Sequence, residues 1–134
     1  MRRTILIALG AWLLFPAGAS ACTIPARPAE ERVREADRAV WAKVAASRKI
    51  DEDDATGTAQ RRYRLRVLET YKGSVRRRIT VIAHDSAGTC GIGPLARGER
   101  LGFVLDGRRG PWLVTRANTI SRSELRSVRR PKRA

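Results

Sequence analysis

The chain is poor in the residues on which most catalytic and metal sites depend. Only two cysteines and one histidine occur among its 134 residues. The single histidine, His84, excludes a metal site built from several histidines. The run His84-Asp85-Ser86 has the residue types of a hydrolase triad, but three consecutive side chains cannot face one another as base, orienting acid and nucleophile. We therefore expect a protein that is not an enzyme and has no cofactor or metal of its own.

The chain also lacks a hydrophobic run long enough to span a membrane. Residues 4–15 form an apolar run of roughly a dozen residues, whereas a spanning helix needs about 20. Arg2 and Arg3 precede this run, and the small residues Ala19-Ser20-Ala21 follow it. This order is typical of an export signal that is cut before Cys22. We predict a signal peptide over residues 1–21, a mature chain without an integral membrane span, and a secreted or periplasmic location.

Both cysteines, Cys22 and Cys90, lie after the predicted cut. In an oxidising compartment an even count implies a disulfide, and closing so long a loop stabilises a fold by roughly 4 kcal/mol; two free buried thiols are the alternative. Cys22 would also begin the mature chain, where its α-amino group and carbonyl oxygen can chelate a metal ion. Acylation of Cys22, as in lipoproteins, would abolish both roles. Ala19 disfavours this alternative, because lipoprotein signals prefer a leucine-like residue at its position.

Acidic residues are scarce beside basic ones. Thirteen Asp and Glu stand against 28 Lys and Arg, which gives a net charge of +15. Such an excess favours binding of polyanions, namely nucleic acid, anionic surfaces or acidic polysaccharide. Single-strand binders add exposed aromatic platforms, of which few are expected here because Tyr63 and Phe103 alternate inward. The candidate polyanion-binding residues are Arg62, Arg64, Arg66, Arg76, Arg77 and Arg78.

Hydrophobic periodicity predicts a mainly β fold. Alternation with period two indicates strands at residues 38–47, from 62 to a turn at 72–74, at 78–83, at 101–105 and at 112–115. The second and third form a hairpin, and the last is expected to pair with the strand before it. A short helix is predicted at residues 29–37, and Ser121 with Glu124 predicts the capping box of another. Five strands and two short helices indicate a small, partly open barrel.

The predicted organisation is a signal peptide over residues 1–21, one barrel domain over 22–121 and a basic C-terminal tail over 122–134. The acidic stretch 51–54 is expected to lie in a solvated loop, because the alternating oxygen spacing of a calcium loop is absent. The last basic residues, 129–133, are expected to be solvated.

Short motifs at matching spacing resemble those of the netrin-type module of the tissue inhibitors of metalloproteinases. The resemblance covers residues 22–120, and it depends on the order of the motifs after the signal cut. The matching residues are Cys22-Thr23-Ile24-Pro25, Ala36-Asp37 with Val44, Tyr63 with Val67 and Tyr71-Lys72-Gly73, Cys90-Gly91, and Gly98-Glu99-Arg100-Leu101.

The resemblance implies a five-stranded oligonucleotide/oligosaccharide-binding (OB) barrel with a Cys22–Cys90 disulfide. It also implies inhibition of a zinc metalloprotease: the α-amino nitrogen and carbonyl oxygen of Cys22 bind the catalytic zinc of the partner, and Thr23 enters the adjacent specificity pocket. The chain departs from the family at a second bridge, whose two positions are Ile24 and approximately Asn118 here. The alternatives are a purely structural role for Cys22, and an OB module that binds polyanions.

Overall fold

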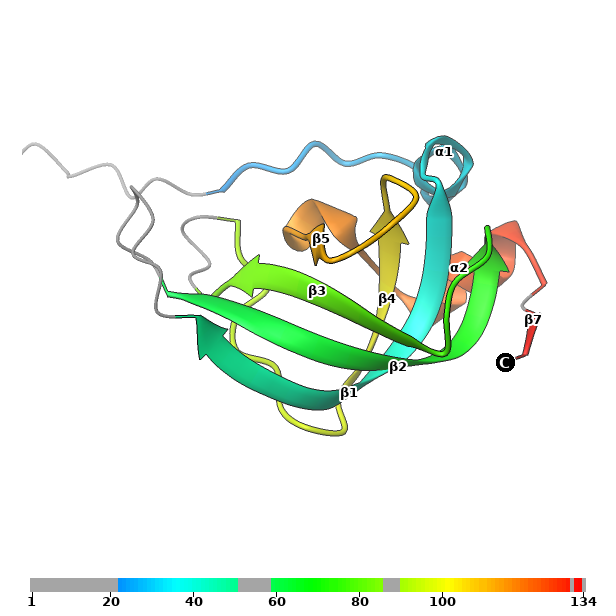
Figure 1. Ribbon diagram of the computed structural model, residues 1–134. Coiled ribbons are helices and arrows are strands. Elements are labelled where there is room, and N and C mark those ends of the chain that lie inside the picture. Colours follow the sequence, from blue (N-terminus) through cyan, green and yellow to red (C-terminus); the bar gives the residue numbers. More distant parts are fainter. Residues whose placement is uncertain (1–21, 51–58, 86–89, 131, 134) are drawn as a thin grey trace, which may run out of the picture.

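The computed structural model describes residues 22–50, 59–85, 90–130 and 132–133. The predicted signal peptide, the acidic stretch 51–54 and Ser86 lie outside the described residues. A strongly curled β-sheet forms the body of the protein, with a short helix towards each end of the described chain (Figure 1). The prediction of a mainly β fold with two short helices is confirmed.

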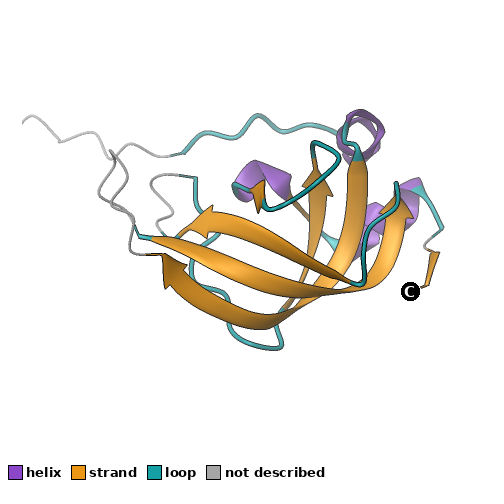
Figure 2. Cartoon of the chain, viewed as in Figure 1, coloured by secondary structure: helices purple, strands orange, loops and turns teal. Residues whose placement is uncertain are grey.

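The sheet follows the order β5-β3-β2-β1-β4-β6, and a short seventh strand, β7, pairs with β2. The strands are β1 (Arg38–Ile50), β2 (Gln60–Lys72), β3 (Arg78–His84), β4 (Arg100–Leu105), β5 (Trp112–Leu113), β6 (Thr119–Ile120) and β7 (Lys132–Arg133). The helices are α1 (Ala29–Glu35) and α2 (Arg122–Val128), and a 3₁₀ turn, η2, covers Arg116–Asn118. Figure 2 shows the helices beside the curled sheet.

Strand β1 is central because it pairs with two neighbours. It runs antiparallel to β2 over its whole length and to β4 over its first half. Register shifts between Ala39 and Val40, Trp41 and Ala42, and Val44 and Ala46 interrupt the β1–β2 pairing. Such bulges bend a strand and increase its twist. Because β1 is bent, the sheet curls around a single layer of core side chains.

The last predicted strand has a different partner from the one expected. Trp112 and Leu113 pair in parallel with Val81 and Ile82 of β3, so the predicted antiparallel pairing with the preceding strand is wrong. The connection at residues 106–111 is too long to enforce a tight hairpin, and it carries the chain across to the free edge of β3. The edge of β4 is taken instead by β6, which the sequence did not predict.

The core is formed by the inward residues of the alternating strands. These residues are Val40, Ala42, Val44, Tyr63, Leu65, Val67, Ile79, Val81, Ala83, Phe103 and Leu105. A second cluster lies where both helices cover the sheet, and its buried residues are Val33, Ala36, Ala39, Tyr71, Val104, Ile120 and Leu125. The helices therefore add a separate small core beside the core enclosed by the curled sheet.

Helix α2 begins with the capping box that the sequence predicts. The Ser121 hydroxyl accepts a hydrogen bond from the Glu124 N–H at 3.2 Å, and the Glu124 carboxylate accepts one from the Ser121 N–H at 2.9 Å. Leu125 anchors the helix because its side chain is fully buried in the second cluster. The start of the basic C-terminal segment thus packs onto the sheet. Near the end of this segment, β7 pairs with β2.

Glu69 of β2 joins this helix to the sheet. Its carboxylate accepts hydrogen bonds from the Tyr71 hydroxyl at 2.6 Å and from Nη2 of Arg122 at 2.5 Å. The Arg122 guanidinium also lies 5.8 Å from the centroid of the Trp41 ring. The hydrogen bond from Arg122 holds the pKa of Glu69 below its usual range. Because the Glu69 residue is buried, this group of side chains stabilises the folded state as a unit.

We predict that Glu69→Gln lowers the free energy of unfolding at pH 7 by about 2 kcal/mol, because it removes a charge-assisted pair and weakens the Tyr71 bond. A lowered folded pKa stabilises the protein above the ordinary carboxyl value of 4.5, and this contribution is lost as pH falls through the folded pKa. Urea denaturation at pH 7, 5 and 3 should therefore show the gap between variant and wild type closing in acid.

The control for Glu69→Gln is Arg126→Gln. Nη2 of Arg126 lies 3.8 Å from the Glu69 carboxylate, and its side chain is 54% exposed. Its loss should change stability by less than about 0.5 kcal/mol. If the difference in unfolding free energy between Glu69→Gln and the wild type did not vary with pH, the assigned role of the carboxylate would be contradicted.

Candidate functional sites: a bridged edge and an arginine-lined groove

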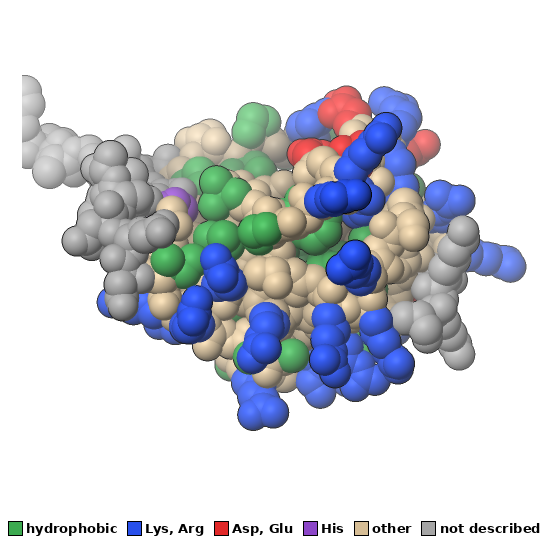
Figure 3. Space-filling model, in the orientation of Figure 1, with side chains coloured by type: hydrophobic (Ala, Val, Ile, Leu, Met, Phe, Trp, Pro, Cys, Tyr) green, Lys and Arg blue, Asp and Glu red, His purple; other side chains and the backbone are tan. Residues whose placement is uncertain are grey.

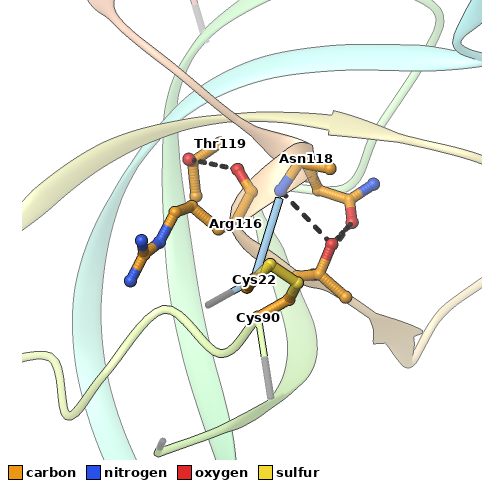
Figure 4. Close-up of a disulfide and its surroundings, with 7 residues drawn as sticks. Cys22, Cys90, Arg116, Asn118 and Thr119 are labelled. Atoms are coloured by element: carbon orange, nitrogen blue, oxygen red, sulfur yellow. Dashed lines mark hydrogen bonds between the residues drawn. A yellow bond between two sulfur atoms is a disulfide. The ribbon is translucent and has the colours of Figure 1, made fainter. Parts of the chain in front are cut away.

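The predicted disulfide between Cys22 and Cys90 is present. The bridge joins residues 68 positions apart in sequence, and their Cα atoms lie 5.2 Å apart, a normal separation for a disulfide. Figure 4 shows the bridge beside the turn that carries Arg116 and Asn118. The beginning of the described chain is therefore fixed covalently to the loop after β3. We name residues 22–25 together with 90–94 the bridged edge.

The loop that carries Cys90 is held by a side chain from the core of the curled sheet. The buried Tyr63 hydroxyl donates to the carbonyl oxygen of Gly93 and accepts from the N–H of Leu95, both at 3.2 Å. Burial raises the pKa of Tyr63, so the phenol stays neutral and can serve as donor and acceptor. The Arg116 N–H donates to the Cys90 carbonyl at 2.8 Å. These contacts maintain Cys90 at a φ of 59°, a left-handed conformation that costs a non-glycine residue about 1 kcal/mol or more.

The chain from Cys22 runs in extended form along the curled sheet to α1 (Figure 1). Thr23, the predicted pocket residue, is exposed, whereas Cys22 is half-buried. At the other end, Arg32 of α1 donates to the carbonyl oxygens of Ala117, at 2.8 Å, and Thr119. The segment before α1 is thus fixed at both of its ends.

Asn118 lies approximately where the resemblance to the netrin-type module would place one half of a second bridge. Its side chain accepts a hydrogen bond from the Thr115 N–H at 2.9 Å and donates one to the Val104 carbonyl at 3.1 Å. Hydrogen bonds therefore hold the η2 turn to β4 without a cysteine. Ile24, at the other position, is half-buried. The amide contributes to the position of the turn, but it makes no covalent link to the N-terminal segment.

The predicted arginine row lies on the outer face of the sheet. Lys and Arg side chains spread over the face that carries β2 and β3, whereas acidic side chains gather near α1 (Figure 3). Four of the six predicted arginines, Arg62, Arg64, Arg76 and Arg78, line one open groove of about 900 Å³. Arg66 lines a separate depression with Lys43 and Arg97. Arg77 is exposed and is not part of the groove lining.

The opposite wall of the groove comes from the segment between β4 and β5, which the sequence did not connect with the arginine row. This segment contributes Arg108, Arg109, Pro111 and Trp112. The parallel β3–β5 pairing places Trp112 opposite Val81, beside the arginines of the sheet. The signal available in the sequence was Trp112, which stands three positions after Arg108-Arg109. It could be linked to the arginine row only through the pairing of β5 with β3, and the sequence pattern had assigned β5 another partner.

Asp37 and Arg38, at the start of β1, hold the two turns that border this groove. Nε of Arg38 donates to the Ser74 carbonyl at 3.0 Å, and Nη1 donates to the Gly107 carbonyl at 2.8 Å. The Asp37 carboxylate accepts from the Gly107 N–H at 2.5 Å. One side chain pair thus connects the β2–β3 turn with the β4–β5 segment.

The remaining candidate residues are engaged elsewhere. Nε2 of His84 lies 3.4 Å from the Gln60 side chain, and Asp85 pairs with Arg61 at 2.7 Å. Within the described ranges, no three His, Cys, Asp or Glu side chains come together as metal ligands. No helix in the same ranges is long and apolar enough to cross a membrane.

The chain matches no model of a known protein family, and a search of characterised proteins found no significant match.

We predict that removal of the bridge by Cys22→Ser together with Cys90→Ser lowers the free energy of unfolding by roughly 4 kcal/mol, as the chain-entropy model gives for so long a loop. Denaturant titration of oxidised and reduced protein measures this loss. Reduction should bring the wild type to the stability of the double variant and should leave the variant unchanged. A wild type that is equally stable with and without reductant would contradict a stabilising bridge.

A comparison of two glycines tests whether the close backbone contact between the β2–β3 turn and Asp37 matters for stability. Gly73 and Gly93 have the same φ of 73°, but a Cβ on Gly73 would lie 2.7 Å from the Asp37 carbonyl oxygen, whereas a Cβ on Gly93 meets nothing within 4 Å. Alanine costs about 1 kcal/mol at either φ. We therefore expect Gly73→Ala to destabilise the protein by about 2 kcal/mol more than Gly93→Ala in urea denaturation. Equal losses would show that the backbone contact at Gly73 is unimportant.

Proposed function

We propose that the protein is a non-catalytic binding module of netrin type that acts outside the cytoplasm, and that its bridged edge binds a partner protein. The candidate partner is a zinc metalloprotease. The observation that carries this proposal is the Cys22–Cys90 bridge, which holds the beginning of the described chain against the loop 90–94. A fixed edge loses little conformational entropy on binding, so its contacts contribute more fully to affinity.

The strand arrangement supports the OB-like part of the proposal. Five neighbouring members of the sheet path, β5-β3-β2-β1-β4, curl around one core, and the two outer strands of this group are consecutive in the chain. This arrangement is compatible with a small, partly open five-stranded barrel. The disulfide is compatible with an oxidising compartment, as the predicted signal peptide requires.

The proposed inhibitory chemistry needs only the first residue of the mature chain. After removal of residues 1–21, the α-amino nitrogen and carbonyl oxygen of Cys22 would be ligands for the partner's zinc. Three protein ligands hold a catalytic zinc and leave one position for water, and the two atoms of Cys22 would displace that water and make the zinc five-coordinate. The exposed Thr23 would enter the neighbouring substrate pocket. No nucleophile or base of this chain takes part.

The direct test inserts one alanine between Ala21 and Cys22. We expect the exported wild-type protein to begin at Cys22 with a free amine and an intact bridge, and to inhibit at least one member of a panel of zinc metalloproteases. The added residue moves the amine away from the zinc, so inhibition should fall by about a hundredfold or more, as expected when a chelating pair is lost. Inhibition constants for both proteins measure the effect.

The matched control places the extra alanine after Arg130, where it leaves the bridged edge unchanged. Intact mass and thermal denaturation should show that both insertion variants retain the disulfide and the fold. Unchanged inhibition by the Cys22 insertion variant, or an acylated Cys22 in the exported wild type, would overturn the chelation mechanism.

A further inference from the structure

The groove between β3 and the β4–β5 segment concentrates unpaired positive charge. The guanidinium groups of six of its lining arginines have no ion pair or hydrogen-bond partner within the described part of the chain, and no Asp or Glu lines the groove. These arginines are Arg62, Arg64, Arg76, Arg78, Arg108 and Arg109. By contrast, Arg61 of β2 and Arg122 of α2 pair with carboxylates. Like charges gathered without counter-charges favour an anionic ligand.

We propose that this groove binds single-stranded nucleic acid, with the arginines on its phosphates and Trp112 as a stacking platform for a base. This proposal goes beyond the bridged edge and does not depend on it. Guanidinium groups form bidentate hydrogen bonds with phosphate oxygens, and a basic groove with an aromatic ring is the usual arrangement of single-strand binders.

The spacing of the arginines on β2 fits a repeating ligand. Arg62 and Arg64 project from the same exposed face and are alternate residues, so they lie about 7 Å apart along the strand. The phosphates of an extended single strand repeat at a similar distance. Arg78, on the neighbouring β3, pairs in register with Arg66 and lies one step further along the same face. The groove therefore offers a row of charges rather than one isolated anion site.

Trp112 is held in a fixed position at this row. Its indole N–H donates to the Gly107 carbonyl at 3.3 Å, and β5 pairs its backbone with β3. Gly110 lies against the ring, where a Cβ would approach ring carbons to 2.5 Å. The residue is half-buried: part of it packs against the core, and it also lines the groove. A ring held in this way can stack on a base without further ordering of its side chain.

The aromatic platform favours a single strand over the other polyanions. In a duplex the bases are stacked on one another, so a groove-wall indole finds no free base face. An acidic polysaccharide supplies charges, and its sugar rings offer the indole only C–H groups, whereas a base stacks its whole π face on the ring. The walls are also preformed, because Arg38 binds the Ser74 carbonyl on one side and the Gly107 carbonyl on the other.

The test measures binding of the full chain to a fluorescently labelled oligothymidylate of about 12 nucleotides by anisotropy over a range of salt concentrations. The groove variant combines Arg64→Gln, Arg78→Gln and Arg109→Gln, all at exposed positions. We expect its affinity to fall by about tenfold or more, and the slope of log K against log salt to decrease by about 2, since each phosphate contact on a single strand contributes about 0.7.

The matched control removes the same charge from exposed positions outside the groove, with Arg34→Gln, Arg129→Gln and Arg130→Gln. Its affinity should change by less than about threefold. Thermal denaturation of both triple variants confirms that the fold is retained. Equal losses in the two variants would mean that net charge alone drives binding, and would overturn the groove assignment.

Two further ligands test the stacking role without a change to the protein. An abasic strand of the same length keeps the phosphates and lacks the bases, and a heparin oligosaccharide of matched charge represents polysaccharide. We expect both to bind several-fold more weakly than oligothymidylate. Equal or tighter binding of either ligand, or no binding of oligothymidylate at low salt, would overturn the proposal of a single-stranded nucleic acid.

Discussion

The pairing of β1 with two strands at once is the constraint on which the rest of the structure depends. Its first half bonds to both β2 and β4, and the irregularities along its pairing with β2 bend it. The curl encloses the core and leaves the outer face of the sheet to charged residues. The start of β1 also brings Asp37 and Arg38 to the meeting point of two turns. The shape of the groove thus depends on where β1 begins.

The segment from Trp112 to Asn118 connects the two candidate sites. Its first residues pair with β3 and form one wall of the groove. A few residues later, the Arg116 N–H bonds to the Cys90 carbonyl, and Asn118 bonds to β4. Covalent and hydrogen-bonded restraints therefore act on the same short stretch of chain. The disulfide and the groove wall are therefore connected along the backbone by a few successive contacts.

Local patterns were sufficient to predict the parts of the fold that local interactions determine. The alternation of Tyr63, Leu65 and Val67 with arginines predicted a strand with one buried face, and the Ser121 capping box predicted a helix start; both are present. The partner of β5 could not be predicted in this way. Parallel pairing with β3 depends on which edge remains free after the sheet curls, and no periodicity within residues 112–115 encodes that choice. The groove was missed for the same reason, since its two walls come from distant segments.

The arginines divide into two groups according to their surroundings, which the total charge does not reveal. Arg61 and Arg122 lie next to carboxylates on neighbouring elements and join those elements together. Those of the groove project from exposed strand and loop positions, where the other lining residues are apolar, uncharged polar or also basic. Placing a carboxylate among them would be a simple way to relieve their mutual repulsion. Because the groove lining contains none, the repulsion persists in the free protein, and an anionic ligand that enters the groove gains from its relief.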